Sequence, residues 1–302
     1  APEATAPEAD YVDEKLPNIR KVIAKAMHNS LSTMAQLTLN TSFDATKILA
    51  LREQLKANAE KFGYGNITLN DMILFAVSRV ILNHRSLNAN YLDDTMRFFN
   101  TVNLGIAVDT DRGLLVPTLM HAEKLSLNEL SAQAKALIGE AQKGTIAPDK
   151  LKNGSFTVTN LGSLGIESFT PVINPPQTGI LGVDTITRRI KEVDGCDVTY
   201  PAMGLSLTFD HRALDGAPAA KFLKELAACA EPAPDMAKFE AVFELLSEVK
   251  EWKPAKTIGT RVYDDKAFVE SVRSQASEGR PLSARQLEFL VKMAVMYSDQ
   301  IS

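Results

Sequence analysis

The chain has 302 residues, of which 45% are apolar and 23% charged, with a net charge of −4. That composition is ordinary for a globular protein and provides enough apolar residues for a core. The small net charge gives no reason to expect binding to nucleic acid or to an anionic membrane. No stretch approaches the roughly 20 apolar residues of a membrane span. Cys196 and Cys229 lack metal-ligand spacing, so we predict no metal. Two free thiols are the simplest interpretation, and a disulfide is the alternative.

Residues 1–10 have the composition of a linker. They read Ala-Pro-Glu-Ala-Thr-Ala-Pro-Glu-Ala-Asp, and such small, acidic and proline residues cannot bury a face. From Leu16 onward, apolar residues recur at helical spacing, with Pro17 near the helix start, where its missing amide proton costs least. A folded domain is therefore predicted to begin at about residue 11.

Short strands and helices alternate along the middle of the chain, which predicts an α/β fold. Strands are expected where apolar and polar residues alternate, and helices where apolar residues recur at helical spacing. Ser126, with Glu129 three residues later, has the spacing of a capping box. The strands are predicted at 35–43, 96–99, 102–108, 114–119, 156–159 and 177–183, with a hairpin at 190–198, and the helices at 16–27, 44–61, 71–83, 126–143 and 217–226.

The stretch at 205–216 combines a strand with a histidine and two carboxylates. Apolar residues alternate from Leu205 to Phe209, as in a half-buried strand, and helical spacing resumes after Gly216. Glycine adopts backbone angles that other residues resist, which suits a turn at this place. His211 therefore follows a strand end, where neutral imidazole suits a general base. On residue types alone, an ordinary structural histidine is the other interpretation.

Several strings in this chain resemble those of one family. Asp-His-Arg-Ala-Leu-Asp-Gly at 210–216 matches the His-x-x-x-Asp-Gly signature of the chloramphenicol acetyltransferase-like superfamily. The segments at 156–162, 169–177 and 179–182 resemble the catalytic domain of dihydrolipoamide acyltransferases, the E2 components of 2-oxo acid dehydrogenase complexes. The resemblance covers roughly 11–229. It implies a two-layer α/β fold with a mixed sheet and helices, as in the chloramphenicol enzyme.

The resemblance also implies roles for particular residues. The reaction is acyl transfer between a dihydrolipoyl thiol and coenzyme A, with His211 as the general base. Thr159 matches the family position whose hydroxyl stabilises the oxyanion, although a β-branched strand residue needs no such role. Asp215 is expected to hold the local architecture, with Arg20 as its ion-pair partner. Asp210 should point to the opposite side from His211 and is assigned no chemistry.

The family's assembly implies the partners of this chain. Members form homotrimers with the active site between neighbours, so His211 and Thr159 would come from different subunits. Trimers join into cubic or dodecahedral cores. Coenzyme A or acetyl-CoA is a substrate, and the lipoyl group sits on a separate domain that is not in this chain. The E1 and E3 components bind through domains absent here, so we expect a catalytic-core fragment or a truncated member. A bacterial-type cytoplasmic location is expected rather than the mitochondrial matrix.

Residues 231–302 fall outside the resemblance. Prolines at 232 and 234 break the preceding helix, and three amphipathic helices are predicted at 237–252, 263–276 and 283–300. The predicted organisation is therefore a linker at 1–10, a catalytic domain at 11–230 and a small all-α extension at 231–302. We assign the extension no role beyond an appended interaction domain.

Three functions remain compatible with the sequence. The first is an E2 acyltransferase. The transferred acyl group is expected to be acetyl, because the sequence at 160–171 resembles that of pyruvate- or acetoin-type bacterial enzymes. The second is a catalytically idle scaffold that displays the C-terminal helices. The third is a free-standing trimeric acetyltransferase that acts on small molecules without a lipoyl substrate.

Overall fold

The computed structural model describes residues 10–193, 196–230, 236–258, 261–277 and 284–300. Nearly all of the predicted linker lies outside these residues, as does the hairpin turn at 194–195. The chain divides into two compact units, Ala1–Glu231 and Pro232–Ser302, which we describe one at a time.

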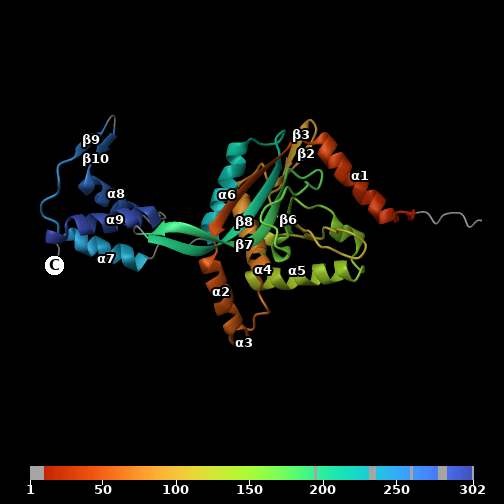
Figure 1. Cartoon of the computed structure of the whole chain (residues 1–302), viewed down its shortest axis with the longest axis horizontal. Helices are drawn as coiled ribbons and strands as arrows, with labels where there is room; N and C mark the ends of the chain where they lie inside the picture. Colours follow the sequence, from red (N-terminus) through yellow and green to blue (C-terminus); the bar gives the residue numbers. More distant parts are fainter. Residues whose placement is uncertain (1–9, 194–195, 231–235, 259–260, 278–283, 301–302) are drawn as a thin grey trace, which may run out of the picture. The chain divides into compact units, whose positions relative to one another are not determined.

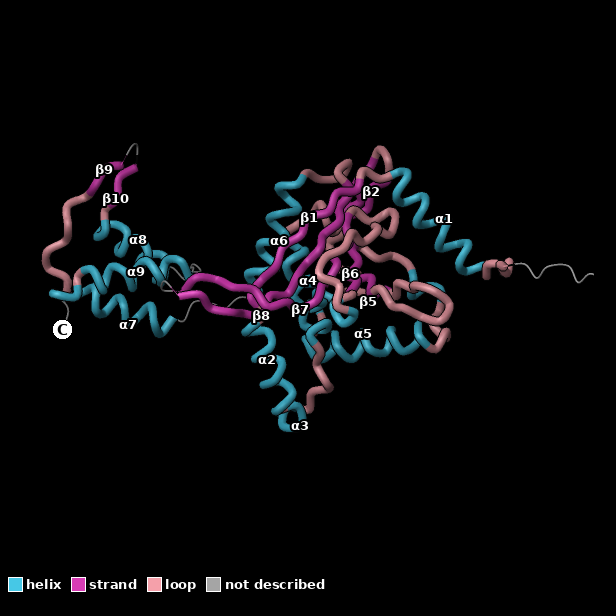
Figure 2. The backbone as a smooth tube through the Cα atoms, in the orientation of Figure 1, coloured by secondary structure: helices cyan, strands magenta, loops and turns pink. Residues whose placement is uncertain are grey.

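The first unit is built on a six-stranded mixed sheet (Figures 1 and 2). Its strand order is β1-β8-β7-β6-β4-β5, and β4, β6 and β7 run parallel while the remaining pairs are antiparallel. The strands are β1 (Gln36–Asp44), β4 (Leu104–Ile106), β5 (Thr118–Leu119), β6 (Phe156–Asn160), β7 (Gly179–Val193) and β8 (Cys196–Asp210). A separate hairpin joins β2 (Ala89–Leu92) to β3 (Thr95–Phe98).

Helices cover one face of this sheet and enclose the hydrophobic core. The helices that contribute to this core are α2 (Thr46–Ala57), α4 (Leu69–Val80), α5 (Leu127–Gln142) and α6 (Gly216–Ala230), and the short α3 (Ala59–Phe62) follows α2. α1 (Asn18–Thr33) lies apart from the core, and its one buried residue is Ser30. Buried side chains of α4 and α6, such as Leu74 and Phe222, pack with strand residues such as Phe156 and Leu207. The predicted two-layer α/β architecture is confirmed.

The local helix signals in the sequence are also confirmed. Ser126 accepts the Glu129 amide at 3.3 Å while the Glu129 carboxylate accepts the Ser126 amide at 2.8 Å. This capping box starts α5 one residue after Ser126, and Thr68 starts α4 through the same arrangement. The strand at 89–92 was not predicted, because Ala-Asn-Tyr-Leu lacks the alternation that marks a half-buried strand.

The other face of the sheet is polar. Successive strand residues point to opposite faces, so burial of Phe156 and Val158 in the core turns Thr157 and Thr159 the other way. On this polar face Thr157 donates to the Gln177 side chain at 2.6 Å. The Ser206 hydroxyl likewise donates to the Asp184 carboxylate at 2.9 Å. No helix among the described residues has the length and apolar content to cross a membrane.

The second unit has its own core. It contains α7 (Met236–Ser247), β9 (Lys256–Ile258), β10 (Arg261–Tyr263), α8 (Asp265–Ser277) and α9 (Ala284–Met296). The predicted helices are present, and the antiparallel pair β9–β10 is an addition that the sequence pattern did not indicate, since each strand has only three residues. Tyr297 is 1% exposed at the centre of this unit. Its hydroxyl donates to Asp265 at 2.8 Å and accepts the Lys253 amide at 3.1 Å.

We predict that Tyr297→Phe destabilises the second unit by roughly 1–2 kcal/mol at pH 7, because the Asp265 carboxylate and the Lys253 amide each lose a partner. Burial first, and then Asp265, raise the pKa of Tyr297 above its ordinary 10.0. The neutral phenol is therefore the stabilised form, and its contribution is lost as pH rises through the folded pKa. Above about pH 10 the wild-type unit should lose stability, and the variant should lose less.

The chain's single tryptophan reports on this unit directly. Trp252 lies 5.1 Å from the Tyr297 ring, so its fluorescence during urea unfolding follows the second unit alone. Equal urea midpoints for wild type and Tyr297→Phe at pH 7 would contradict the prediction.

Candidate active site

His211 directly follows β8 and is held by its backbone. Its amide donates to the Ala35 carbonyl at 2.8 Å, which ties it to the turn before β1. The imidazole is 45% exposed, with Nδ1 3.8 Å from Asp215 Oδ1. That distance is too long for a hydrogen bond, so Asp215, itself 85% exposed, does not fix the ring within one chain. The ring is therefore accessible to a substrate.

Asp210 lies on the opposite side, as predicted, but it is not idle. It is fully buried, and its carboxylate accepts Arg212 Nε at 3.0 Å and Arg212 Nη2 at 2.7 Å. This hydrogen bonding raises the pKa of the Arg212 guanidinium. The guanidinium carbon also lies 4.4 Å from the centre of the Tyr91 ring. Sequence reasoning missed Arg212, because its partner Tyr91 comes from a distant strand.

Thr159 is half-buried near the end of β6, on the polar face of the sheet. It pairs with Gly182 on β7, which pairs in turn with Ser206 on β8. A Cβ on Gly182 would lie 2.7 Å from the Phe169 ring, so glycine is needed there for the ring to cover the sheet beside Thr159. The Phe169 ring therefore covers β7 at the residue that pairs with Thr159.

The structure does not bring Thr159 and His211 together within one chain. Thr159 on β6 is separated from Ser206 on β8 by one intervening strand, β7. His211 lies five residues after Ser206, directly beyond the end of β8. With strands about 4.8 Å apart and a rise of about 3.3 Å per residue, the two Cα atoms are roughly 19 Å apart. A single site that uses both side chains therefore needs more than one copy of the chain.

Arg20 lies away from Asp215 within the chain. Its guanidinium is beside Gly113, in the turn after β4, where a Cβ on the glycine would meet Arg20 Nη2 at 3.1 Å. No ion pair joins Arg20 to Asp215 among the described residues, so that pairing stays a prediction for contacts between copies. Gly216 begins α6 without a left-handed φ, and a Cβ there would meet no described atom within 4 Å. The backbone geometry at residue 216 therefore does not require glycine, contrary to our expectation that this turn depends on its conformational freedom.

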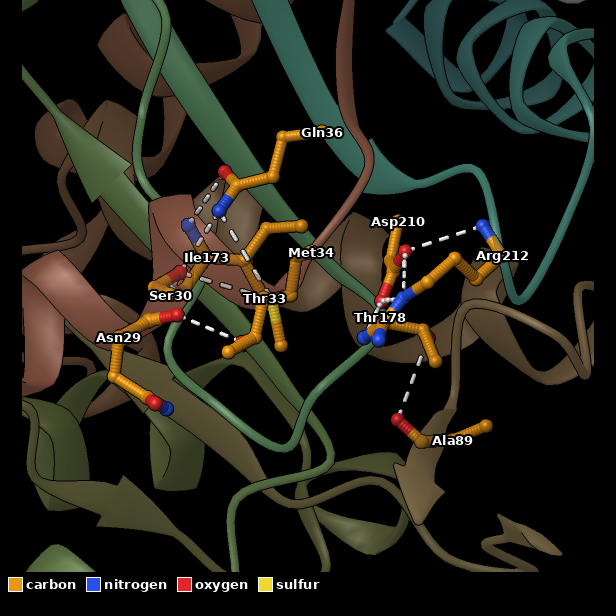
Figure 3. Close-up of polar contacts among 10 residues, drawn as sticks. All are labelled: Asn29, Ser30, Thr33, Met34, Gln36, Ala89, Ile173, Thr178, Asp210 and Arg212. Carbon is orange, nitrogen blue, oxygen red and sulfur yellow. Dashed lines mark hydrogen bonds and ion pairs between the residues drawn. The ribbon is translucent and has the colours of Figure 1, made fainter. Parts of the chain in front are cut away.

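A segment with proline residues crosses the polar face and anchors the residues beside His211. Figure 3 shows Ser30 donating to the Ile173 carbonyl at 2.7 Å and accepting from Gln36 Nε2 at 2.8 Å. Gln36 Oε1 accepts the Ile173 amide at 3.2 Å. This ring of contacts joins α1, β1 and the extended segment at 169–177, so Ala35, which holds the His211 amide, has a fixed position.

The cleft and the other histidine considered next do not involve the candidate catalytic residues, His211 and Thr159. A cleft of about 720 Å³ opens beside Arg52, Thr68 and Asn160, and neither His211 nor Thr159 lines it. His121 starts a short 3₁₀ turn, with Nδ1 3.9 Å from Glu123, in keeping with a structural role. No cluster of metal-binding side chains occurs among the described residues, and both cysteines are free.

The comparisons with known proteins identify the family. Residues 8–237 match the model of the 2-oxoacid dehydrogenases acyltransferase catalytic domain. This chain belongs to that family. It is 39% identical over 226 residues to the dihydrolipoyllysine-residue acetyltransferase component of the acetoin cleaving system of Bacillus subtilis, covering 73% of this chain and 56% of that protein. It is also 39% identical over 227 residues to the acetyltransferase component of the pyruvate dehydrogenase complex of the same species, covering 74% of this chain and 51% of that protein. The chain thus spans about half the length of these curated relatives.

Two solved structures of acyltransferase cores are similar to the first unit. One is the dihydrolipoamide acetyltransferase of Azotobacter vinelandii, with a TM-score of 0.69, 30% identity and coverage of 75% of this chain and 96% of that one. Its serine, histidine and asparagine, studied for their role in catalysis, are spaced along the chain as Thr159, His211 and Asp215 are here. The other is the cubic core of the pyruvate dehydrogenase multienzyme complex, with a TM-score of 0.69, 29% identity and the same coverage.

Asp184 provides a stability test of the polar face. It is 2% exposed, and burial raises its pKa despite the hydrogen bond from Ser206. The group therefore stabilises the fold while protonated, and that contribution is lost as pH rises through the folded pKa. We predict that Asp184→Asn raises the midpoint temperature of thermal unfolding at pH 8 by roughly 2–4 °C, equivalent to about 1 kcal/mol in the free energy of unfolding. At pH 4 the same substitution should change the midpoint temperature much less.

Calorimetry at fixed protein concentration measures this effect. Asp149→Asn is the control, because Asp149 is solvent-exposed and should respond equally little at both pH values. An Asp184→Asn midpoint that is unchanged or lowered at pH 8 contradicts the assignment of a destabilising buried charge.

Proposed function

We propose that this chain transfers an acetyl group between a dihydrolipoyl thiol and coenzyme A, with His211 as the general base and Thr159 as the oxyanion donor. The observation that carries the proposal is the identical spacing of the catalytic serine, histidine and asparagine in the Azotobacter enzyme and of Thr159, His211 and Asp215 here. Both Bacillus relatives are named acetyltransferases, which supports acetyl as the group.

The chemistry follows from the properties of the groups. A thiol is mostly protonated at neutral pH, whereas the thiolate is the nucleophile. His211 is exposed enough to reach an incoming thiol and takes its proton as the sulfur attacks the thioester carbonyl of the other substrate. The tetrahedral oxyanion then accepts a hydrogen bond from the Thr159 hydroxyl, which stands on the polar face of the sheet. The imidazolium returns its proton to the departing thiolate.

We propose that the chain works as a homotrimer in which His211 of one copy meets Thr159 of the next. The separation of roughly 19 Å within one chain supports this arrangement, because an oxyanion donor must lie within hydrogen-bond distance of the reacting atoms. The similarity to a cubic multienzyme core supports further assembly of trimers. The lipoyl group would arrive on a separate domain, and the E1 and E3 components would act through regions outside this chain.

The test is acetyl transfer from acetyl-CoA to dihydrolipoamide by the full chain. We predict that His211→Ala abolishes transfer and that Thr159→Ala lowers kcat by about 10²–10³, as loss of one oxyanion donor does elsewhere. Thr159→Ser keeps the hydroxyl and should retain most of the rate. His121→Asn is the control, because asparagine tolerates the left-handed φ of 53° at this exposed histidine.

The outcomes separate the candidate functions. An assembled wild-type protein that does not transfer acetyl refutes the proposal and favours the scaffold. Full activity of His211→Ala refutes His211 as the base. Equal activity of Thr159→Ala and wild type removes the oxyanion role.

A further inference from the structure

We propose that Tyr91, Arg212 and Asp210 form a clamp that positions His211 for proton transfer, an inference that rests on the proposed function of that histidine. The clamp is defined by these three side chains. Two contacts link them beside the turn that follows β8: the hydrogen-bonded ion pair between Arg212 and Asp210, and the Tyr91 ring against the Arg212 guanidinium. None of the three is expected to touch substrate, so they are positioning residues rather than catalytic ones.

The first contact is the fork between Arg212 and Asp210. Two guanidinium nitrogens reach the carboxylate, and the Arg212 amide also donates to Asp210 Oδ1 at 3.1 Å. Asp210 is fully buried, and a buried carboxylate without its cation is strongly unfavourable. The residues on both sides of His211 are therefore held to each other. The planar arginine fork fixes their orientation in a way that a single lysine ammonium cannot.

The second contact is the Tyr91 ring, which covers the guanidinium at 4.4 Å. Tyr91 is set by β2, since its amide donates to the Pro176 carbonyl at 2.9 Å. The same stretch of chain holds Asp210, whose amide donates to the Thr178 carbonyl at 2.9 Å. Figure 3 shows Thr178 between Asp210 and Ala89, the residue two before Tyr91. The ring and the carboxylate are thus anchored to one piece of backbone, with Arg212 between them.

The clamp matters because no hydrogen bond orients the His211 ring among the described residues; its one ring contact is Phe209, with the ring centres 5.7 Å apart. Its Asp215 contact is 3.8 Å long, and both side chains are exposed. The Ala35 carbonyl fixes the His211 amide alone. The direction of the imidazole therefore depends on the backbone on both sides of His211, which the clamp sets. A displacement of about 1 Å at a reacting group can lower the rate about a hundredfold.

The experiment compares Arg212→Lys and Tyr91→Leu with conservative and matched controls in the assembled full chain. We expect kcat for acetyl transfer to fall about tenfold or more, while KM for acetyl-CoA and dihydrolipoamide changes less than about twofold. Tyr91→Phe keeps the ring and should restore kcat to within about threefold of wild type. Arg85→Lys is the matched control: Arg85 covers the Phe98 ring at 3.9 Å, in the same hairpin region, and should leave both constants unchanged.

A second readout does not need transferase activity. Carbethoxylation by diethyl pyrocarbonate, followed by mass spectrometry, measures the reactivity of His211 against His28, His84 and His121 as internal references. In Arg212→Lys and Tyr91→Leu the relative rate at His211 should change at least about threefold, and in Tyr91→Phe and Arg85→Lys it should not.

The clamp is overturned if kcat and His211 reactivity in both test variants match wild type, or if only KM changes. If Arg212→Lys fails to assemble, Tyr91→Leu carries the test alone, because it leaves the buried ion pair in place. A wild-type protein without acetyl transfer defeats the proposed function, and the reactivity of His211 then still decides whether the clamp orients it.

Discussion

The register of the central strands is the constraint on which the rest of this structure depends. Thr159, Gly182 and Ser206 stand in one row across β6, β7 and β8, while His211 follows the end of β8. Backbone hydrogen bonding fixes this row, and a slip of one residue would turn Thr159 into the apolar core. The two candidate catalytic groups are therefore held rigidly and far apart on one chain. Chemistry that needs both has to be completed by a neighbouring copy.

The two faces of the sheet in the first unit differ in composition and in role. The helix-covered face supplies the stability, through a continuous apolar cluster that includes Leu74, Phe156 and Phe222. The polar face holds hydroxyl, amide and carboxyl groups that are satisfied by one another, such as Thr157 with Gln177 and Ser206 with Asp184. A polar sheet face is costly unless each group finds a partner.

Much of the fold could be predicted from the sequence, because local rules decided it. The capping box at Ser126 and the alternation leading to Phe209 each placed an element correctly. The function of His211 could be proposed from its motif, but its surroundings could not. Arg212 contacts Tyr91, a residue that lies far away along the sequence, and no local sequence pattern predicts such a contact. The separation of Thr159 from His211 likewise follows from strand order and register, which become known only with the structure.

The most direct measurement of the central claim is complementation between two inactive chains. His211→Ala and Thr159→Ala chains, co-expressed in equal amounts with different tags, are purified as mixed assemblies and assayed for acetyl transfer. If each site takes its histidine from one copy and its threonine from another, about a quarter of the sites contain both native side chains, and activity returns to about that fraction of wild type. Mixed assemblies no more active than either variant alone would contradict an active site shared between copies.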